Sequence, residues 1–496
     1  MSRAIGGAPW RRQWATSDVL LGVVAFVSGA ACLSIEVLGP RYLSAVFGST
    51  NAVWTAMIVV TLGGLALGYL IGSRVNITQA RRVLQWSLGG SAAYTLAIGH
   101  IVWHTSSGIG EYGPWALYAV SVAGFFVPSV ALGLSGTLII VLRAVYCPGS
   151  VGAHAGTVYA TSTIGSICGA IVTTHWLVPM LGLAATLKCI AAALALAMLA
   201  LGVVRGGASL LVLAIISPME AMTWEAKWPL QHQEDTQYAT VRIYAQGSRV
   251  MFGIGPSCES LFDRATCTAL GPYALLLSEA ISTRAPGRAL IVGGAGNALA
   301  LELESRGWSV TVCEIDERIA QLSDKYFGAM KGRWAIGDGR AVLRSCGRSE
   351  FDYVVLDAFA GPGIIPDHLS SQEFLGEVSR VLKPDGLCAM NTICVVGGSE
   401  SELFVSYAAT MRSVFPFVTY APVTDVSNRS RSYQNVLLFG RSDQGELSVR
   451  ARVVGQVGGT VLTDDCSNAS ELAARLQAIH WSGYPIGRHA ASAHGM

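Results

Sequence analysis

Charged residues are nearly missing from a long stretch in the first half of this chain, and this constrains its fold more than any other feature. Between positions 19 and 204 only eight residues are charged, whereas from position 223 onward the composition is that of a soluble domain. Over all 496 residues, 13% are charged and 52% are hydrophobic, about half the usual charged share of a soluble protein. We therefore expect a membrane component followed by a soluble domain.

Six apolar segments in the first half reach the length of about 20 residues that a membrane-spanning helix needs. They lie at 19–39, 52–73, 84–104, 115–137, 153–175 and 182–204. Arginines precede the first segment and follow the second, fourth and sixth, whereas the opposite side has only Arg41 and Lys188. This excess predicts a multi-pass inner-membrane protein with its N-terminus (residues 1–18) and its C-terminal domain in the cytoplasm. Residues 205–222 are expected to form a linker or interfacial segment, too short to cross.

Two details of the apolar half bear on packing and function. Gly64, Gly68 and Gly72 recur every four residues, as do Gly165 and Gly169, a spacing that predicts close helix packing rather than a substrate groove. Glu36 is the one acid within a predicted span. It is a functional candidate, with solvation or pairing to Arg41 as the structural alternative.

Composition also argues against several classes of function. A net charge of +2 gives no case for nucleic acid as a partner. The 11 cysteines are scattered, without zinc spacing, so we expect reduced thiols and no metal. Transporters usually have more spans and more buried polar residues than this half.

The soluble half begins with a small β domain, predicted at 223–270. Runs at 240–244 and 249–252 flank a glycine-containing turn, which is typical of a hairpin. From 271 to 496 strands and helices alternate, with strands expected at 289–292, 310–313, around 334, at 354–356 and at 387–391. This pattern predicts an α/β, doubly wound, Rossmann-like domain whose ligand binds at the carboxyl ends of the strands.

Glycines and acids stand at the ends of these predicted strands. The turn "GGAGNA" contains Gly293, Gly294 and Gly296, and Glu314 follows Gly294 by 20 residues. A glycine turn lets the backbone approach a ligand, and an acid at that spacing accepts hydrogen bonds from ribose hydroxyls. Asp338 and Gly339 follow the third strand, where a carboxylate suits an adenine amino group. The set favours a ligand of the S-adenosylmethionine type over a dinucleotide.

A third acid, Asp357, ends the fourth strand and opens the loop "DAFAGPGIIPDHLS". The motifs "IVGGAGNALA", "VCEID", "GDGRAVL", "DAFAGPGIIPDHLSSQEF" and "VLKPDG" together resemble the spermidine synthase (polyamine aminopropyltransferase) family, and most closely its membrane-fused branch. The resemblance covers most of residues 236–440. It implies transfer of an aminopropyl group from decarboxylated S-adenosylmethionine to an amine. Glu314 would then hold the ribose, Asp338 the adenine, and Asp357 would belong to the catalytic loop.

Two positions depart from that family. Its glycine motif reads G-G-G-D-G-G, with an Asp that contacts the aminopropyl amine, and here that position is Gly296. Its catalytic loop reads D-S-S-D-P or D-S-T-D-P, with a second Asp that helps to deprotonate the attacking amine, and here that position is Ala360. Without the first acid, S-adenosylmethionine itself is an alternative donor, which opens methyl or aminocarboxypropyl transfer or an intramolecular displacement.

Asp357 then remains as the base or as a ligand for an ammonium group, and His368 is an alternative base. Asp367 is expected to be a solvated loop acid. Asp464 and Asp465 are expected to cap a helix at 467–476, with closure of the site as the alternative. Tyr273, Tyr238 and Gln237 are candidates for the substrate pocket.

Three functions follow. The first is a membrane-bound, spermidine synthase-like transferase acting on an amine. The second is another S-adenosylmethionine-dependent enzyme, with an amphiphilic acceptor reached through the bilayer. The third is a non-catalytic metabolite sensor that gates the membrane helices. The lipid bilayer is an expected partner, and a homo-oligomer is left open.

Overall fold

The computed structural model describes residues 9–47, 51–108, 114–147, 149–202, 204–216, 228–236, 238–255, 257–361, 363–424, 433–443, 447–455 and 458–480. The chain divides into two compact units. One comprises Met1–Leu43, Asn51–Gly110 and Pro114–Thr223, and the other Ser44–Thr50, Glu111–Gly113 and Trp224–Met496.

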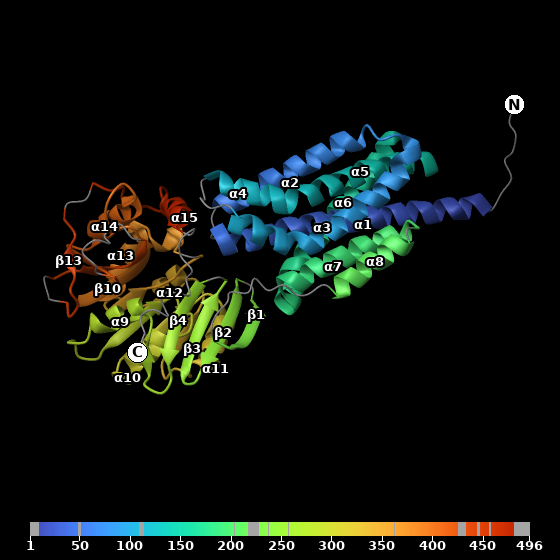
Figure 1. Cartoon of the computed structure of the whole chain (residues 1–496). Helices are drawn as coiled ribbons and strands as arrows, with labels where there is room; N and C mark the ends of the chain where they lie inside the picture. Colours follow the sequence, from blue (N-terminus) through green and yellow to red (C-terminus); the bar gives the residue numbers. More distant parts are fainter. Residues whose placement is uncertain are drawn as a thin grey trace, which may run out of the picture. The chain divides into compact units, whose positions relative to one another are not determined.

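The first unit is a bundle of long helices (Figure 1). In chain order they are α1 (Pro9–Phe47), α2 (Asn51–Gly72), α3 (Ile77–Gly108), α4 (Pro114–Ser121), α5 (Val127–Tyr146), α6 (Val151–Val172), α7 (Val178–Ala200) and α8 (Val204–Ile216). Short π-helical turns, η1 (Val122–Phe126) and η2 (Thr173–Leu177), join α4 to α5 and α6 to α7. The short helix α8 packs on α7 and α3, so the segment after the last predicted span joins the bundle.

Within the described residues, four helical runs are long and apolar enough to cross a membrane. They are Asp18–Ser44, Asn51–Gly72, Trp115–Tyr146 and Val151–Ala200. The last run holds the predicted fifth and sixth segments, and its backbone breaks at Gly182, where φ is 82° and ψ is 173°. The third predicted segment lies inside α3, which is less apolar than these four. The number of crossings stays a prediction.

The glycines of the bundle lie where helices touch backbone to backbone. A Cβ atom added to Gly68 would lie 2.3 Å from the carbonyl oxygen of Val130 on α5, and one on Gly133 would lie 2.6 Å from that of Leu65 on α2. A Cβ atom on Gly165 would lie 2.1 Å from the carbonyl oxygen of Phe26 on α1. The predicted close packing is confirmed, because only glycine permits this approach. Glu36 lies half-buried on α1.

The second unit begins with a five-stranded antiparallel sheet in sequential order: β1 (Leu230–Asp235), β2 (Thr240–Gln246), β3 (Arg249–Ile254), β4 (Ser257–Asp263) and β5 (Thr268–Ala269). The predicted hairpin forms its centre. Gln246 pairs with Arg249 across a two-residue turn in which Gly247 has a φ of 62°. The hairpin is therefore part of a larger meander than the sequence pattern indicated.

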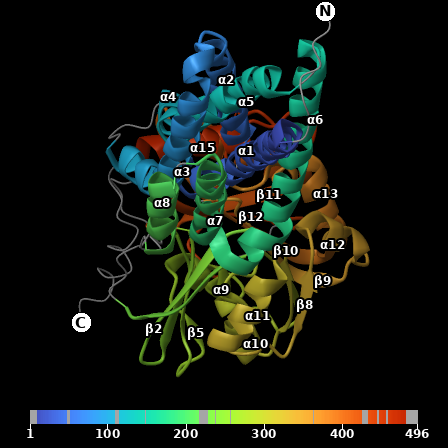
Figure 2. The ribbon, with the colours of Figure 1, turned by 90° about the vertical axis from the view of Figure 1, so that its right-hand side faces the viewer.

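The second sheet has eight strands in the order β13-β11-β12-β10-β9-β6-β7-β8, which can be followed in Figure 2 from β12 through β10 and β9 to β8. The strands are β6 (Arg288–Val292), β7 (Ser309–Glu314), β8 (Arg333–Ile336), β9 (Phe351–Leu356), β10 (Leu382–Cys394), β11 (Phe417–Pro422), β12 (Gln434–Arg441) and β13 (Arg452–Val453). Strands β8, β7, β6, β9 and β10 run parallel, and β12 is antiparallel to β10. The doubly wound fold predicted from the sequence is confirmed, and its strand order reverses between β6 and β9.

Helices precede, connect and follow the strands of this second sheet. They are α9 (Pro272–Glu279), α10 (Ala298–Ser305), α11 (Glu317–Tyr326), α12 (Gly339–Ser345), α13 (Gln372–Val381), α14 (Glu402–Val414) and α15 (Ala469–His480), with a 3₁₀ turn, η3 (Asp367–Leu369). Alternate residues of each strand enter separate cores. Leu290 packs in a cluster with residues of α12 to α15, whereas Ile291 packs with residues of α9 and α10. Both faces of the sheet are thus covered, and its carboxyl edge is where a site can form.

Candidate active site

The glycine turn after β6 lies directly against the start of the loop after β9. Gly293 has a φ of 99°, and a Cβ atom there would lie 2.2 Å from the carbonyl oxygen of Asp357. The N–H of Asp357 donates to the carbonyl oxygen of Val292 over 2.8 Å. Only glycine permits this contact, so the fold joins the glycine turn and Asp357 at the switch point of the sheet.

Glu314, at the end of β7, is buried beside the same turn. Its Oε2 accepts from the N–H of Gly294 over 3.0 Å, and its Oε1 accepts from the N–H of Asp316 over 3.0 Å. Burial raises the pKa of Glu314, and these backbone hydrogen bonds lower it in part. A carboxylate has about four acceptor positions. The backbone of Ile315 takes a third position, which leaves about one for a donor group of a ligand.

Asp338 follows β8 and has two structural tasks. Its Oδ1 accepts from the N–H groups of Arg340 and Ala341 over 3.1 Å each and so caps α12. Its Oδ2 lies 2.8 Å from Nε2 of His368. Although burial raises the pKa of Asp338, the hydrogen bond to His368 and the cap hold it below the ordinary value. His368, considered above as an alternative base, is thus placed beside the predicted adenine acid.

Two exposed isoleucines stand between these strand ends. Ile315 follows Glu314 directly and is 45% exposed, and Ile336 ends β8 and is 46% exposed. Ile336 pairs with Glu314 in the strand register, so both side chains lie at one edge of the sheet. An apolar surface beside Glu314 and Asp338 suits a flat base attached to a ribose. The sequence signal was available, since each isoleucine adjoins a strand-end motif.

Asp357 is half-buried and held by a chain of amides. Nδ2 of Asn391 donates to Oδ1 of Asp357 over 2.8 Å, and Nδ2 of Asn435 donates to Oδ1 of Asn391 over 3.0 Å. Burial raises the pKa of Asp357 to about 7, although the hydrogen bond from Asn391, and next the nearby Tyr273 hydroxyl, lower it in part. Sequence reasoning missed both asparagines. Their signal was a polar residue inside the apolar runs of β10 and β12.

Tyr273, a candidate from the sequence, lies in this centre. Its hydroxyl donates over 2.6 Å to the carbonyl oxygen of Glu259 on β4, and it also interacts with the Asp357 carboxylate. The half-buried Glu259 was missed by sequence reasoning. Burial, and next the charge of Asp357, raise its pKa to about 7. The alternation of residues along β4 does not predict where the Glu259 side chain points, because the pairing of β4 with β3 shifts register at this residue.

The two positions without the family's acids differ in their surroundings. Gly296 has a φ of 76°, and a Cβ atom there would lie 2.5 Å from Cβ of Ser260 and 3.0 Å from Cβ of Phe252. Strands β3 and β4 therefore occupy the space that an aspartate at 296 needs. Ala360 belongs to the loop after β9, where its N–H donates to the carbonyl oxygen of Ile364 over 2.7 Å.

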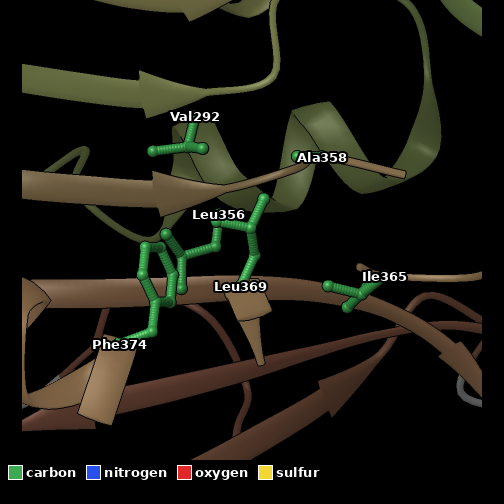
Figure 3. A pocket seen from close by; sticks show the side chains of 6 residues that line it. All are labelled: Val292, Leu356, Ala358, Ile365, Leu369 and Phe374. Atoms are coloured by element: carbon green, nitrogen blue, oxygen red, sulfur yellow. The ribbon is translucent and has the colours of Figure 1, made fainter. Parts of the chain in front are cut away.

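The loop after β9 folds back over the strand ends and is fixed there by apolar contacts. A small cavity of about 10 Å³ lies beneath it. It is lined only by apolar side chains, which face one another in Figure 3: Val292, Leu356, Ala358, Ile365, Leu369 and Phe374. A Cβ atom on Gly339 would lie 2.6 Å from Cγ1 of Val292 and 3.5 Å from Cδ2 of Leu369. Gly339 thus lets α12 close onto the same packing.

Two expectations about acids of this region are wrong. Asp367 is not a solvated loop acid, because its Oδ1 accepts from the N–H of Ser470 over 3.1 Å and its Oδ2 from the Ser470 hydroxyl over 2.8 Å, at the start of α15. Asp464 does not cap that helix; it accepts from Arg340 over 2.7 Å and from Ser371 over 2.6 Å. The first turn of α15 takes its acceptor from the loop after β9.

We expect Asp367→Ala to destabilise the soluble unit by about 1 to 2 kcal/mol, because it removes the acceptor at the start of α15. Chemical denaturation of the purified protein in detergent, followed by circular dichroism, measures this change. Asp465→Ala, at an exposed neighbouring acid, is the matched control. Equal midpoints for the two variants would show that α15 does not depend on Asp367.

Tyr238, another predicted pocket residue, lies at the other sheet. Tyr238 is 51% exposed in the turn between β1 and β2, and its N–H donates to the Thr236 hydroxyl over 3.1 Å. Gln237 lies outside the described residues. Among the residues that the structure describes, no three His, Cys, Asp or Glu side chains gather as a metal site would require.

The sequence of this chain is similar to that of known proteins. Residues 277–433 match the model of the spermine/spermidine synthase domain. The polyamine aminopropyltransferase of Vibrio vulnificus (strain CMCP6) is 32% identical over 155 residues, which are 29% of this chain and 49% of that relative. The chain thus spans about half the length of this curated relative.

Solved structures were compared as well. A probable spermidine synthase from Corynebacterium glutamicum ATCC 13032 is 23% identical with a TM-score of 0.39, over 45% of this chain and 82% of its own. The spermidine synthase of Thermotoga maritima is 16% identical with a TM-score of 0.33, over 43% of this chain and 73% of its own. The similarity to the spermidine synthase family thus rests on residues 277–433, which match its domain model, and on the likeness to the curated polyamine aminopropyltransferase.

Proposed function

We propose that this chain is a membrane-bound transferase that moves an alkyl group, of the aminopropyl type, from S-adenosylmethionine or its decarboxylated form to an amine. One observation carries the proposal. Glu314, Asp338 and Asp357 stand at the carboxyl ends of three parallel strands around one glycine turn, in a domain similar to those of the spermidine synthase family. The first two acids suit an adenosyl group, and the third lies where its sulfonium substituents would extend.

The chemistry asks little of the leaving group, because a sulfonium is already activated. In-line placement of the two reactants and exclusion of water can then account for much of the acceleration. The nucleophile needs more help, since an alkyl amine has a pKa of about 10, like lysine, and must lose a proton. A half-buried carboxylate whose pKa is about 7 is a suitable base near neutral pH. We assign that role to Asp357.

A second candidate uses S-adenosylmethionine itself and an amphiphilic acceptor that approaches through the bilayer. It is favoured by Gly296, which leaves the glycine turn without an acid that would repel the donor's carboxylate, and by the four apolar helices. Methyl transfer, aminocarboxypropyl transfer and intramolecular displacement all belong to it. In either case we place the protein in the inner membrane with the catalytic domain in the cytoplasm. A sensor function would bind the same donor without turnover.

Titration of the purified protein in detergent with both donors, side by side, separates these functions. Calorimetry gives the two affinities, and mass analysis of mixtures with putrescine identifies the products. The main proposal expects preference for the decarboxylated donor, release of methylthioadenosine and an added aminopropyl group on putrescine. Release of S-adenosylhomocysteine would instead identify methyl transfer, and binding without any product would identify a sensor.

The wild-type pH profile is a further prediction. Because Asp357 must be ionised to act as a base, kcat/KM should rise about tenfold per pH unit below pH 7 and level off above it. Initial rates between pH 5.5 and 8.5, at a donor concentration far below KM, measure the profile. A rate that is constant down to pH 5.5 would exclude a base with this pKa.

A further inference from the structure

Glu259 stands at an irregularity of β4 that turns its side chain out of the strand pattern. Phe252 pairs with Ser260, but the next residue of β3, Gly253, pairs with Cys258. Glu259 thus lies between the two paired positions, as the extra residue of a β-bulge does. Bulges redirect one side chain and occur beside active sites. The Tyr273 hydroxyl donates over 2.6 Å to the carbonyl oxygen that the bulge frees at Glu259, which fixes the backbone there.

The bulge lies against the glycine turn. Gly296 touches Ser260, the residue after Glu259, and Gly293 touches Asp357. Gly293 and Gly296 are three residues apart, so their Cα atoms are at most about 11 Å apart. Glu259 and Asp357 therefore border the same short turn, one from each sheet of the second unit. Tyr273 interacts with both residues.

The groups of this centre that can carry a charge near pH 7 are both acids, Glu259 and Asp357. Burial, and next the charge of Asp357, raise the pKa of Glu259 to about 7, while a hydrogen bond with the Ser257 side chain lowers it in part. The other titratable groups beside them stay neutral at pH 7. Burial raises the pKa of Cys258 to about 12, and it raises that of the Tyr273 phenol well above the ordinary value. A cation placed between the two carboxylates would allow both to ionise.

We propose that Glu259 and Asp357 together bind the ammonium group of the acceptor amine. This inference rests on the proposed function and adds Glu259 to the residues that hold the acceptor. The second carboxylate of the centre then comes from a bulge in the β4 strand, rather than from the glycine turn at Gly296 or from the loop at Ala360.

During transfer, the ammonium group first gives one proton to the carboxylate pair. The neutral nitrogen then attacks the methylene carbon next to the sulfonium. A C–N bond forms, the C–S bond breaks, and its electron pair goes to sulfur, which leaves as a neutral thioether. The alkylated amine carries the positive charge away, and the pair releases its proton to solvent.

The test is calorimetric titration of the full-length protein in detergent with putrescine, in the presence of methylthioadenosine. Glu259→Gln keeps the side-chain length and removes the charge. We expect it to weaken putrescine binding about tenfold or more, as loss of a charged hydrogen bond does, and to leave the affinity for methylthioadenosine within about twofold. Glu279→Gln, at an exposed acid on α9, is the matched control and should bind like wild type. Butane-1,4-diol, which is as long as putrescine but uncharged, should not bind to any of the three proteins.

The pH profile of putrescine binding gives a second readout. Glu259 ionises only as the pH rises through about 7, so putrescine binding by wild type should strengthen across that range more than binding by Glu259→Gln. Equal putrescine affinity in wild type and Glu259→Gln, or no binding by wild type, would overturn the inference. Product formation is measured in a separate experiment. Putrescine binding that depends on Glu259 without any product would support the amine site and overturn the proposed transfer instead.

Discussion

Replacing Asp357 with asparagine should lower kcat/KM by about 100-fold to 10,000-fold, because an amide cannot accept the proton that the amine must lose. The amide oxygen can still accept from Asn391, so the loop should keep its place. Initial rates with decarboxylated S-adenosylmethionine and putrescine measure the effect. Asp385→Asn, at an exposed acid of the second unit, is the control for a loss of one negative charge. Activity of Asp357→Asn within tenfold of wild type would remove Asp357 from the role of base.

The same substitution should stabilise the protein above neutral pH. The folded chain binds a proton at Asp357 up to about pH 7, whereas the unfolded chain releases it near the ordinary pKa of 3.8. Asp357 therefore contributes nothing below about pH 4, destabilises progressively between pH 4 and 7, and has its full effect above pH 7. Asp357→Asn should gain on the order of 1 to 3 kcal/mol at pH 8 and little at pH 4. A loss of stability at pH 8 would contradict the burial of this charge.

Restoring the family's acid at the glycine turn should damage this protein. We expect Gly296→Asp to lower the free energy of unfolding by about 2 to 5 kcal/mol. It should not raise activity with either S-adenosylmethionine or its decarboxylated form. The left-handed backbone at φ 76° costs a non-glycine residue about 1 to 2 kcal/mol. The new Cβ atom, 2.5 Å from Cβ of Ser260, adds an overpacking cost of about 1 to 3 kcal/mol. Chemical denaturation and the transfer assay measure both outcomes.

Gly247→Asp is the matched control for this substitution. Gly247 also has a positive φ, of 62°, but a Cβ atom there would meet open space at the tip of the hairpin. Only the backbone cost should remain, about 1 kcal/mol, since aspartate tolerates this conformation better than most residues. A Gly296→Asp variant that is as stable as Gly247→Asp would mean that β3 and β4 yield and that the clash does not bar an acid from this turn.

Local patterns predicted much of the fold because each depends on neighbouring residues. Short apolar runs predicted the five parallel strands, and the turn at Gly247 predicted the centre of the first sheet. The division near residue 223 followed from charge alone. The helices of the bundle were predicted less accurately. The fifth and sixth apolar segments belong to one helical run, which is interrupted at the backbone of Gly182.

Side-chain partners were predicted less well than positions along the chain. Asp367 looked like a solvated acid, but it accepts from Ser470, which is 103 residues away in sequence. His368 was predicted only as an alternative base, and its contact with Asp338 could not be inferred from the sequence. Neither partner is close in the chain, and polar side chains leave no periodic pattern from which such pairs can be inferred.

What the sequence by itself determined is the fold class of the soluble half and the places of Glu314, Asp338 and Asp357. Carboxyl ends of parallel strands share one edge of a sheet, so acids that end such strands converge without further information. Only the tertiary structure decided that Glu259 lies at the same glycine turn as Asp357. That meeting requires a one-residue register shift between β3 and β4 and the packing of two sheets around one glycine turn, and both arise from contacts between segments distant in the sequence.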